Sequence, residues 1–516
     1  MLDQSQTPIL SALQASSRRP HAAFYAPGHK RGQGASHRLR DLLGDAALAA
    51  DLPELPELDN LFAPEGVILE AQALAAEAFG ADHTYFLANG STCGIEAAIL
   101  ATVGPGEKII VPRNAHRSVV AGLVLAGAMP IFVAPEYSRE LGLALGVKAE
   151  DIAAALTQHP DSRAVLLVSP TYHGVCSDVG AIASLAHAHG IPLLIDEAHG
   201  PHFAFHPDLP TPALAQGADL VVQSTHKVLG ALSQAAMLHT RGSRIDSSRL
   251  QAALQLTQST SPNALLLASL DAARHQMATE GQALLSHTLE LTQNMRRELA
   301  AIPGLTVIDQ PAVTAFSSVS DLDLTRLTVD VSGLGITGLE ADDMLHTELG
   351  VTVELPELRH LTLIISLGNT EADGEQCVAG LRSLAERCAA SRSISKQGPQ
   401  PCPNGQPVGA HGTRPAESGR AQDLVSAPAD TPFTLPEVTP RTAFFAATET
   451  VAASAAVGRL SADTVSAYPP GIPTLVAGER ITAAAIAHLT AIKNQGGYVT
   501  GGDAPEKFRV LAQERE

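Results

Sequence analysis

The stretch DLVVQSTHK, residues 219–227, decides the fold class of this chain. It contains a short apolar strand that is followed closely by a lysine, Lys227. A lysine at a strand end is most often a solvated surface group. Here Ser224 and His226 flank the strand end and could both donate hydrogen bonds to a phosphate. A partly buried amine has a lowered pKa and can form a Schiff base. The stretch therefore predicts a site at the ends of buried strands, with Lys227 as its reactive amine.

Further short apolar runs alternate with helical patterns rich in alanine and leucine. Strands separated by helices predict a parallel sheet with crossover connections. We therefore expect a doubly wound α/β domain over residues 61–310, after an N-terminal segment of residues 1–60. Its other expected strands are residues 108–112, 129–134, 164–169 and 192–196.

Composition divides the rest of the chain. Residues 311–391 alternate between strand patterns (327–331 and 361–367) and helical ones, and predict a smaller α/β domain. Residues 392–437 are dense in Pro, Gly, Ser and Gln, which is typical of a flexible linker. Apolar content then returns and predicts a small C-terminal lobe over residues 438–516.

Charge and cysteine usage exclude several classes of protein. The 516 residues carry a net charge of −19, which argues against binding to nucleic acid or to an anionic membrane surface. No C-x-x-C pair occurs among the five cysteines, so neither a disulfide framework nor a zinc site is expected. No signal peptide and no spanning apolar run is evident. We expect a soluble, cytoplasmic protein.

A glycine-containing turn follows the apolar run of residues 85–87. The stretch ANGSTCG, residues 88–94, leads into a helical pattern and places Ser91 and Thr92 at the helix start. Free N–H groups and hydroxyls at such a position form a phosphate cradle. A glycine turn in which Ser91 or Thr92 only caps the helix is the more frequent explanation for such a stretch taken alone.

The stretch LLIDEAH, residues 193–199, places Asp196 at the end of a buried strand. A buried acid is costly unless it is paired, so we expect a cationic partner for Asp196. Residues 196–199, DEAH, also match a sequence motif of helicases. A helicase needs a phosphate-binding loop of the form G-x-x-x-x-G-K-[ST] upstream, and the sequence has none.

Several histidines lie near these stretches. His116, in VPRNAHRS at residues 111–118, could lie flat against an aromatic ring, or it could be an ordinary helix-start residue. His199, His202 and His206 lack a carboxylate or cysteine set that would complete a metal site, so we assign no metal.

The order of these features along the chain is more informative than any one of them. A phosphate cradle, a stacking histidine, a strand-end aspartate and then a lysine are the parts of a pyridoxal-phosphate site. In such a site the aspartate keeps the pyridine nitrogen protonated and the lysine carries the aldehyde.

With these parts the chain resembles the fold type I pyridoxal-phosphate enzymes. More narrowly, it resembles the bacterial ornithine/lysine/arginine decarboxylase family in its short form, which lacks the N-terminal wing domain. The linker is longer and more biased in composition than in that short form. The resemblance is carried by YAPGHK (25–30), FGAD (79–82), NAHRS (114–118), SPTYHG (169–174), DEAH (196–199), STHK (224–227) and YPPG (468–471).

The resemblance implies a role for each site residue. Lys227 forms the internal aldimine, Asp196 pairs with the pyridinium nitrogen, and His199 lies near the substrate, so these three are the expected catalytic residues. His116 stacks on one face of the ring and Ala198 packs on the other. The remaining expected cofactor contacts are Thr171 at the ring oxygen and Ser91, Thr92, Ser224 and His226 at the phosphate.

The implied reaction is decarboxylation of lysine, arginine or ornithine to cadaverine, agmatine or putrescine, with pyridoxal 5'-phosphate as cofactor, in polyamine biosynthesis. Glu479 could contact the substrate or merely cap local structure. The family's habit implies a homodimer or a higher homo-oligomer. Two alternatives stay open: another fold type I activity, such as an aminotransferase or an aldolase/lyase, and a non-catalytic relative that regulates a partner.

Overall fold

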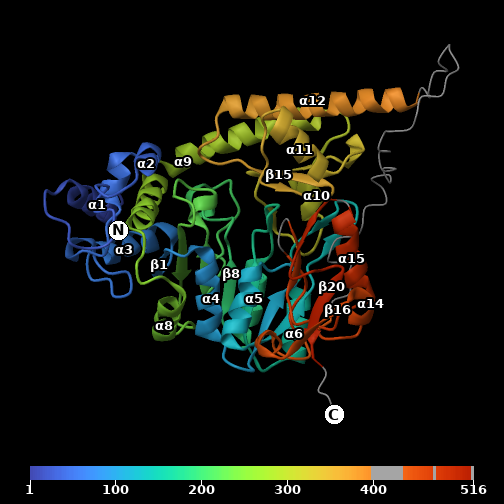
Figure 1. Cartoon of the computed structure of the whole chain (residues 1–516), viewed down its shortest axis with the longest axis horizontal. Helices are drawn as coiled ribbons and strands as arrows, with labels where there is room; N and C mark the ends of the chain where they lie inside the picture. The colour runs from blue at the N-terminus through green and yellow to red at the C-terminus, as the bar shows by residue number, and fades with distance from the viewer. Residues whose placement is uncertain (397–433, 469–471, 495, 513–516) are drawn as a thin grey trace.

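The computed structural model describes residues 1–396, 434–468, 472–494 and 496–512 (Figure 1). Most of the predicted linker, residues 397–433, lies outside the described residues, as do positions 469–471 of the YPPG stretch.

A seven-stranded sheet forms the centre of the molecule, and its strand order is β1-β10-β9-β8-β6-β2-β3. Neighbours from β9 to β3 pair in parallel, and only β10 runs against the others. The doubly wound, mainly parallel sheet is therefore confirmed, while the antiparallel insertion of β10 was not predicted. The strands are β1 His83–Leu87, β2 Lys108–Pro112, β3 Met129–Val133, β6 Ser162–Val168, β8 Leu193–Asp196, β9 Leu220–Gln223 and β10 Ala236–Thr240.

Both faces of the sheet are covered because apolar side chains of the central strands point to both of them. Ile109 and Val111 pack in one core cluster while Ile110, between them, packs in another, as the two-residue period of a strand requires. The first cluster is covered by α4 Gly90–Thr102, α5 Arg117–Ala126 and α8 Ser247–Thr257; the second is covered by α6 Ala149–Gln158 and α7 Val179–Ala188.

The N-terminal segment is fastened to the long helix α9 (Ala264–Ala300) by a buried ion pair. Asp271 accepts hydrogen bonds from the N–H groups of Ile9 and Leu10, at the start of α1 (Pro8–Arg18). Arg274, 2.5 Å from Asp271, donates to two backbone carbonyls of the preceding residues. The pair thus satisfies two free N–H groups at the start of α1 and two carbonyls of the residues before it. The same segment contains α2 His37–Ala50 and packs on α3 Val67–Phe79.

A smaller sheet follows in the order β11-β13-β15-β14, with α11 and α12 packed on it (Figure 1). Two boundaries differ from those predicted. The strand β11 already begins at residue 306, and α12 continues to residue 396, into the predicted linker. The elements are β11 Thr306–Val307, β13 Arg326–Asp330, α11 Gly338–Glu348, β14 Leu355–Pro356, β15 His360–Ile364 and α12 Glu371–Lys396. No helix among the described residues is both long and apolar enough to cross a bilayer.

The C-terminal elements pack beside α5 of the large domain, through α13 (Figure 1). Arg113, in the loop after β2, fastens them there: it donates to the carbonyls of Pro473 and Thr474 and to the Glu479 carboxylate. The elements are α13 Pro440–Phe445, β16 Thr448–Ala452, α14 Ala453–Ala456, β17 Val465–Tyr468, β18 Pro473–Leu475, α15 Ala483–Asn494, β19 Tyr498–Thr500 and β20 Lys507–Leu511.

Replacing Asp271 with alanine tests the anchor of the N-terminal segment. We expect the free energy of unfolding to fall by about 3–5 kcal/mol, because Arg274 would remain buried without its carboxylate. Urea denaturation followed by circular dichroism measures this. Asp246→Ala is the matched control, since Asp246 also accepts from two N–H groups but lies at the exposed start of α8, where a cap contributes about 1 kcal/mol. Equal losses in the two variants would contradict the anchor.

Candidate active site

The site lies at one edge of the large sheet. The strands β2, β6, β8 and β9 are parallel, so their carboxyl ends meet at the same edge. β1 reaches that edge too, because it is antiparallel to β10, which is antiparallel to β9. The residues that follow these five strand ends include every predicted cofactor-binding residue.

Lys227 ends a short 3-10 turn, Thr225–Lys227, directly after β9. Its Nζ lies 2.9 Å from Nε2 of His199 and 5.2 Å from the centre of the Tyr172 ring. The Tyr172 and His199 rings are tilted against each other at 4.5 Å. The amine is therefore held between an imidazole and an aromatic face.

The surroundings of Lys227 favour the neutral amine. Burial lowers the pKa of Lys227, and the carboxylates of Asp196 and Glu354 act in the opposite direction. The guanidinium of Arg326 lowers that pKa further. A neutral amine has the lone pair that attack on an aldehyde requires.

Asp196 is the last residue of β8 and is only 5% exposed. Its Oδ1 accepts a hydrogen bond from the Ala198 N–H at 3.2 Å, and it forms no ion pair within the described part of the chain. Burial raises the pKa of Asp196, while the Lys227 charge opposes that rise. A buried carboxylate without a cation suits a protonated ring nitrogen, so this residue fits pyridoxal phosphate.

Glu197 points away from the site although it follows Asp196 directly. Its carboxylate accepts from the Gln223 amide at 2.7 Å, and the Gln223 oxygen lies 3.0 Å from Nε2 of His239. Burial raises the pKa of Glu197 to about 7. Glu197 therefore joins β8 to β9 and β10 inside the sheet, and of the two acids only Asp196 remains for the site.

The residues predicted to bind a phosphate come from the start of α4 and the end of β9, where Ser91 and Ser224 lie together. Gly90 has a positive φ of 77° and starts α4, whose first N–H groups have no partner within the helix. Ser91 lies in this first turn, and its Oγ is 2.7 Å from the Oγ of Ser224. Thr92 follows with an exposed side chain, while the Thr225 hydroxyl, on the other strand end, is buried without a hydrogen-bond partner among the described residues. These donors fit a phosphate.

His226 and His116 are both kept uncharged. Burial lowers the pKa of His226, and Lys227 adds to this. Burial lowers the pKa of His116 to about 4, and the charges of Lys227 and Arg117 contribute. His116 also caps α5, because its Nδ1 accepts from the Ser118 N–H at 3.2 Å. The ring of His116 is thus held by its own helix in a neutral state, which fits a flat contact with an aromatic cofactor.

Thr171 lies in the loop after β6, and its side chain is buried. Its Oγ1 accepts a hydrogen bond from the Val175 N–H at 3.2 Å. The same loop carries Tyr172, so the position of the loop determines where the Tyr172 ring lies against Lys227.

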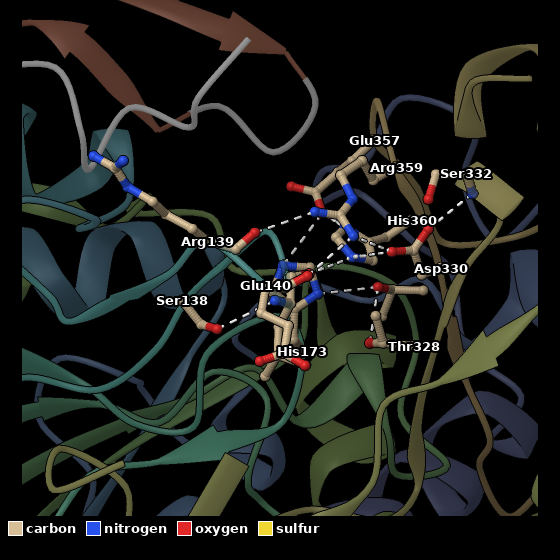
Figure 2. A network of polar contacts seen from close by, with 12 residues as sticks. Ser138, Arg139, Glu140, His173, Thr328, Asp330, Ser332, Glu357, Arg359 and His360 are labelled. Atoms are coloured by element: carbon tan, nitrogen blue, oxygen red, sulfur yellow. Dashed lines mark hydrogen bonds and ion pairs between the residues drawn. The ribbon is translucent and has the colours of Figure 1, made fainter. Parts of the chain in front are cut away.

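A polar network fastens this loop to the smaller sheet (Figure 2). Nδ1 of His173 lies 3.1 Å from the Thr362 hydroxyl of β15, and its Nε2 lies 3.3 Å from Glu357. Nearby, His360 donates to the Leu141 carbonyl at 2.9 Å, and Arg359 pairs with Asp330. The smaller sheet therefore holds the loop next to Lys227 in place.

Glu479 lies in the C-terminal lobe and is 1% exposed. Its Oε2 accepts from Arg113 at 3.0 Å and from the Val476 N–H at 2.8 Å. Its Oε1 is buried and has no hydrogen-bond partner among the described residues. Glu479 therefore has a structural role, because it binds Arg113 and the Val476 N–H. The contact with the substrate stays a prediction.

The histidines considered as metal ligands have other partners. His202 pairs with Asp323 at 3.2 Å, and His206 lies 2.9 Å from the Ser286 hydroxyl. Within the described ranges, no three His, Cys, Asp or Glu side chains are grouped so that they could hold an ion.

Two residues at the site were not foreseen. Tyr172 was quoted only as part of a motif, yet its ring contacts both Lys227 and His199. Arg326 begins β13 and is fully buried beside His199. A charged residue at the start of an apolar strand is usually exposed to solvent. The sequence therefore contains no indication that Arg326 is buried at the site.

Fold and site together define the class of protein. A doubly wound sheet with a partly buried lysine and a buried aspartate at adjacent strand ends is the large domain of the fold type I enzymes. Among solved structures, the lysine decarboxylase LdcF of Francisella novicida matches 98% of this chain with a TM-score of 0.80, at 21% identity and over 81% of its own length. At that identity the likeness establishes the fold alone.

The sequence establishes the family. Residues 7–373 match the Orn/Lys/Arg decarboxylase major domain, and residues 422–501 match the C-terminal domain of the same family. The chain belongs to the Orn/Lys/Arg decarboxylase family, and it is a carboxy-lyase.

Curated relatives cover nearly the whole chain. The arginine decarboxylase of Halalkalibacterium halodurans is 38% identical over 511 residues, which are 99% of this chain and 98% of that protein. The arginine decarboxylase of Bacillus subtilis is 37% identical over 521 residues. The lysine decarboxylase LdcA of Pseudomonas aeruginosa is 27% identical over 92% of this chain and 74% of its own.

The neutral state of His116 has a measurable consequence for stability. Its pKa is about 4 in the folded protein against an ordinary value of 6.5, so between these pH values the unfolded chain binds more protons. Acidification through this window therefore destabilises the fold, and His116→Gln should reduce the fall in melting temperature between pH 6.5 and pH 4. His287→Gln, at an exposed position on α9, is the control and should change the pH profile little. An unchanged profile in His116→Gln would refute the buried neutral state.

Proposed function

We propose that this chain decarboxylates a basic amino acid with pyridoxal 5'-phosphate bound at Lys227, and that arginine is its substrate. The observation that carries the proposal is the partly buried Lys227 amine, which follows β9, next to the buried Asp196 carboxylate at the end of the neighbouring strand β8. The names of the relatives favour arginine, since those at 37–38% identity are arginine decarboxylases. The products would be agmatine and carbon dioxide.

Bound pyridoxal phosphate would supply an electron sink for the pair of electrons left on Cα when the carboxylate leaves. Asp196 would keep a proton on the ring nitrogen, for which its buried carboxylate is the counter-charge. His116 and Ala198 would pack on the two faces of the ring, and Thr171 would contact the ring oxygen.

The phosphate would lie at the start of α4. Ser91 and Thr92 are in the first turn of that helix, and Ser224 and His226 come from the end of β9. The helix start adds free N–H groups and the positive end of a dipole.

Proton transfer would depend on Lys227 and His199. Their nitrogens lie 2.9 Å apart, so one proton can be held between them and returned to Cα from either residue. The Tyr172 ring contacts both residues and would limit the access of water on that side.

Recognition of the substrate's distal cation is assigned to the C-terminal lobe. A buried carboxylate oxygen without a partner favours a cation, and Oε1 of Glu479 is such an atom. In this proposal residues 61–310 bind the cofactor, residues 311–391 and 438–516 complete the site, and residues 392–437 connect the last two. The net charge of −19 would attract a cationic substrate.

We also propose a cytoplasmic homodimer. Large apolar side chains are exposed in and near the N-terminal segment, and a second copy could cover them. They include Phe24 at 94%, Leu42 at 80% and Leu256 at 80% exposure.

Assays with arginine, lysine and ornithine test the reaction and the choice of substrate. We expect release of carbon dioxide and agmatine from arginine and little product from the other two. Lys227→Ala should lower the rate by more than about 10²-fold and remove the visible band that borohydride abolishes in the wild type. Lys493→Ala, at the surface of α15, is the control. Amino-group transfer to a 2-oxo acid without carbon dioxide would show an aminotransferase. A colourless wild type, indifferent to the cofactor, would show a non-catalytic relative.

Asp196→Asn tests the counter-charge of the ring nitrogen. The amide is nearly isosteric but neutral, so the ring would lose its proton and withdraw electrons less well. We expect the cofactor to bind while the turnover rate falls by about 10²-fold or more. Asp219→Asn, at the opposite end of β9, is the control. Full activity of Asp196→Asn would remove this residue from the mechanism.

A further inference from the structure

Arg326 is a fully buried cation whose guanidinium lies beside His199. Its Nη2 donates to the His199 carbonyl at 2.9 Å and lies 3.5 Å from Nδ1 of the same residue. It forms no ion pair within 4 Å in the part of the chain that the structure describes, and its Nε and Nη1 have no hydrogen-bond partner there. Gly174 packs against the base of its side chain, where an added Cβ would be 2.8 Å from the Cβ of Arg326. The base of the side chain is therefore tightly packed, and the hydrogen bond to the His199 carbonyl holds the guanidinium.

His199 has a donor on one side and an amine on the other. Arg326 lies at Nδ1, and Lys227 lies at Nε2, 2.9 Å away. A neutral imidazole has one N–H and one lone pair, and the partner of one nitrogen determines the state of the other. An arginine offers only donors and stays protonated in proteins, whereas a lysine amine can lose its proton when buried.

Arg326 and a charged Lys227 would both donate to His199, whose neutral ring has only one lone pair to accept with. If Nδ1 carried the hydrogen, it would face the N–H groups of Arg326 without an acceptor. With the hydrogen on Nε2, the lone pair of Nδ1 faces Arg326, and the N–H of Nε2 faces the lone pair of a neutral Lys227 amine. Because only Lys227 can give up its proton, the second arrangement is the consistent one.

Resting on the proposed function, we propose that Arg326 is a positioning residue that fixes the hydrogen of His199 on Nε2 and so keeps the Lys227 amine in its neutral, nucleophilic form. Other titratable groups facing His199 are His116 and His202, and the carboxylates facing Lys227 are Asp196 and Glu354. The two carboxylates would favour a charged Lys227. Arg326 opposes them, and burial together with Arg326 lowers the pKa of both His199 and Lys227.

The consequence concerns attachment of the cofactor. With pyridoxal phosphate present, the Lys227 nitrogen would attack the aldehyde carbon, a C–N double bond would form, and the aldehyde oxygen would leave as water with the two hydrogens of the amine. A charged amine has no lone pair for this step. The neutral hydrogen bond from His199 is weak by comparison and can be replaced by the arriving aldehyde.

The rate at which pyridoxal phosphate attaches to the apoprotein, followed by its visible band from pH 6 to pH 10, tests the proposal. Arg326→Met should move the midpoint of the pH profile up by about one unit, because Lys227 regains basicity. At pH 7 attachment should then be about tenfold slower. Arg326→Lys, which keeps a buried donor and charge, should recover most of the rate. Melting curves of all variants establish that they are folded.

A double-mutant cycle separates action through His199 from the bare charge of Arg326. In His199→Gln the side-chain amide can donate to Lys227 whatever lies behind it. In that background Arg326→Met should shift the midpoint by only a few tenths of a unit. An equal shift with and without the imidazole would mean that Arg326 acts by charge alone and would overturn the proposal.

Nitrogen-15 spectra of histidine-labelled apoprotein give the tautomer without any cofactor. We expect the His199 signal to show a hydrogen on Nε2 and a bare Nδ1, and Arg326→Met to lose this preference. A hydrogen on Nδ1 in the wild type would overturn the proposal. A wild type that never attaches the cofactor would instead remove the proposed function, and the spectra would still decide the state of His199.

Discussion

The structure depends on two ionisable groups that the strand ends bring into the interior. Asp196 and Lys227 end or follow the neighbouring strands β8 and β9, and both are largely removed from water. Isolated buried charges are strongly unfavourable, so such groups persist only where partners or a ligand compensate for them. The neutral histidines, the cradle of hydroxyls and the fastened loop after β6 all surround this pair. The surrounding fold thus shields the Lys227 amine from water.

The sequence was sufficient for the parts of the fold that rest on local pattern. Five apolar runs became the parallel strands, because continuous apolar stretches between helices have few other arrangements. β10 was missed since an antiparallel strand inside a parallel sheet is set by pairing with β1 and β9. The boundary at residue 310 was displaced for a similar reason: the two-residue strand β11 exists only through its pairing with β13.

The site divides in the same way. Asp196, Lys227 and Ser91 could be predicted from the sequence, because each lies near the end of an apolar run or at the start of a helical pattern. Arg326 is distant in sequence and reaches the site only because the smaller sheet packs against the loop after β6. Contacts of this kind depend on how two sheets meet, and a periodicity within one segment carries no information about them.

The ion pair between Arg113 and Glu479 has a consequence for how this chain can vary. Arg113 lies three positions before His116 in one loop, so the lobe that holds Glu479 is seated on the same few residues that hold the ring of His116. The seat is buried, and the contacts of Arg113 described above all lie within residues 473–479 of the lobe. Doubling the length of a connecting segment costs only about 0.6 kcal/mol of closure entropy. We therefore expect a single change at Arg113 to affect the position of the lobe more than a change in the length of the connection.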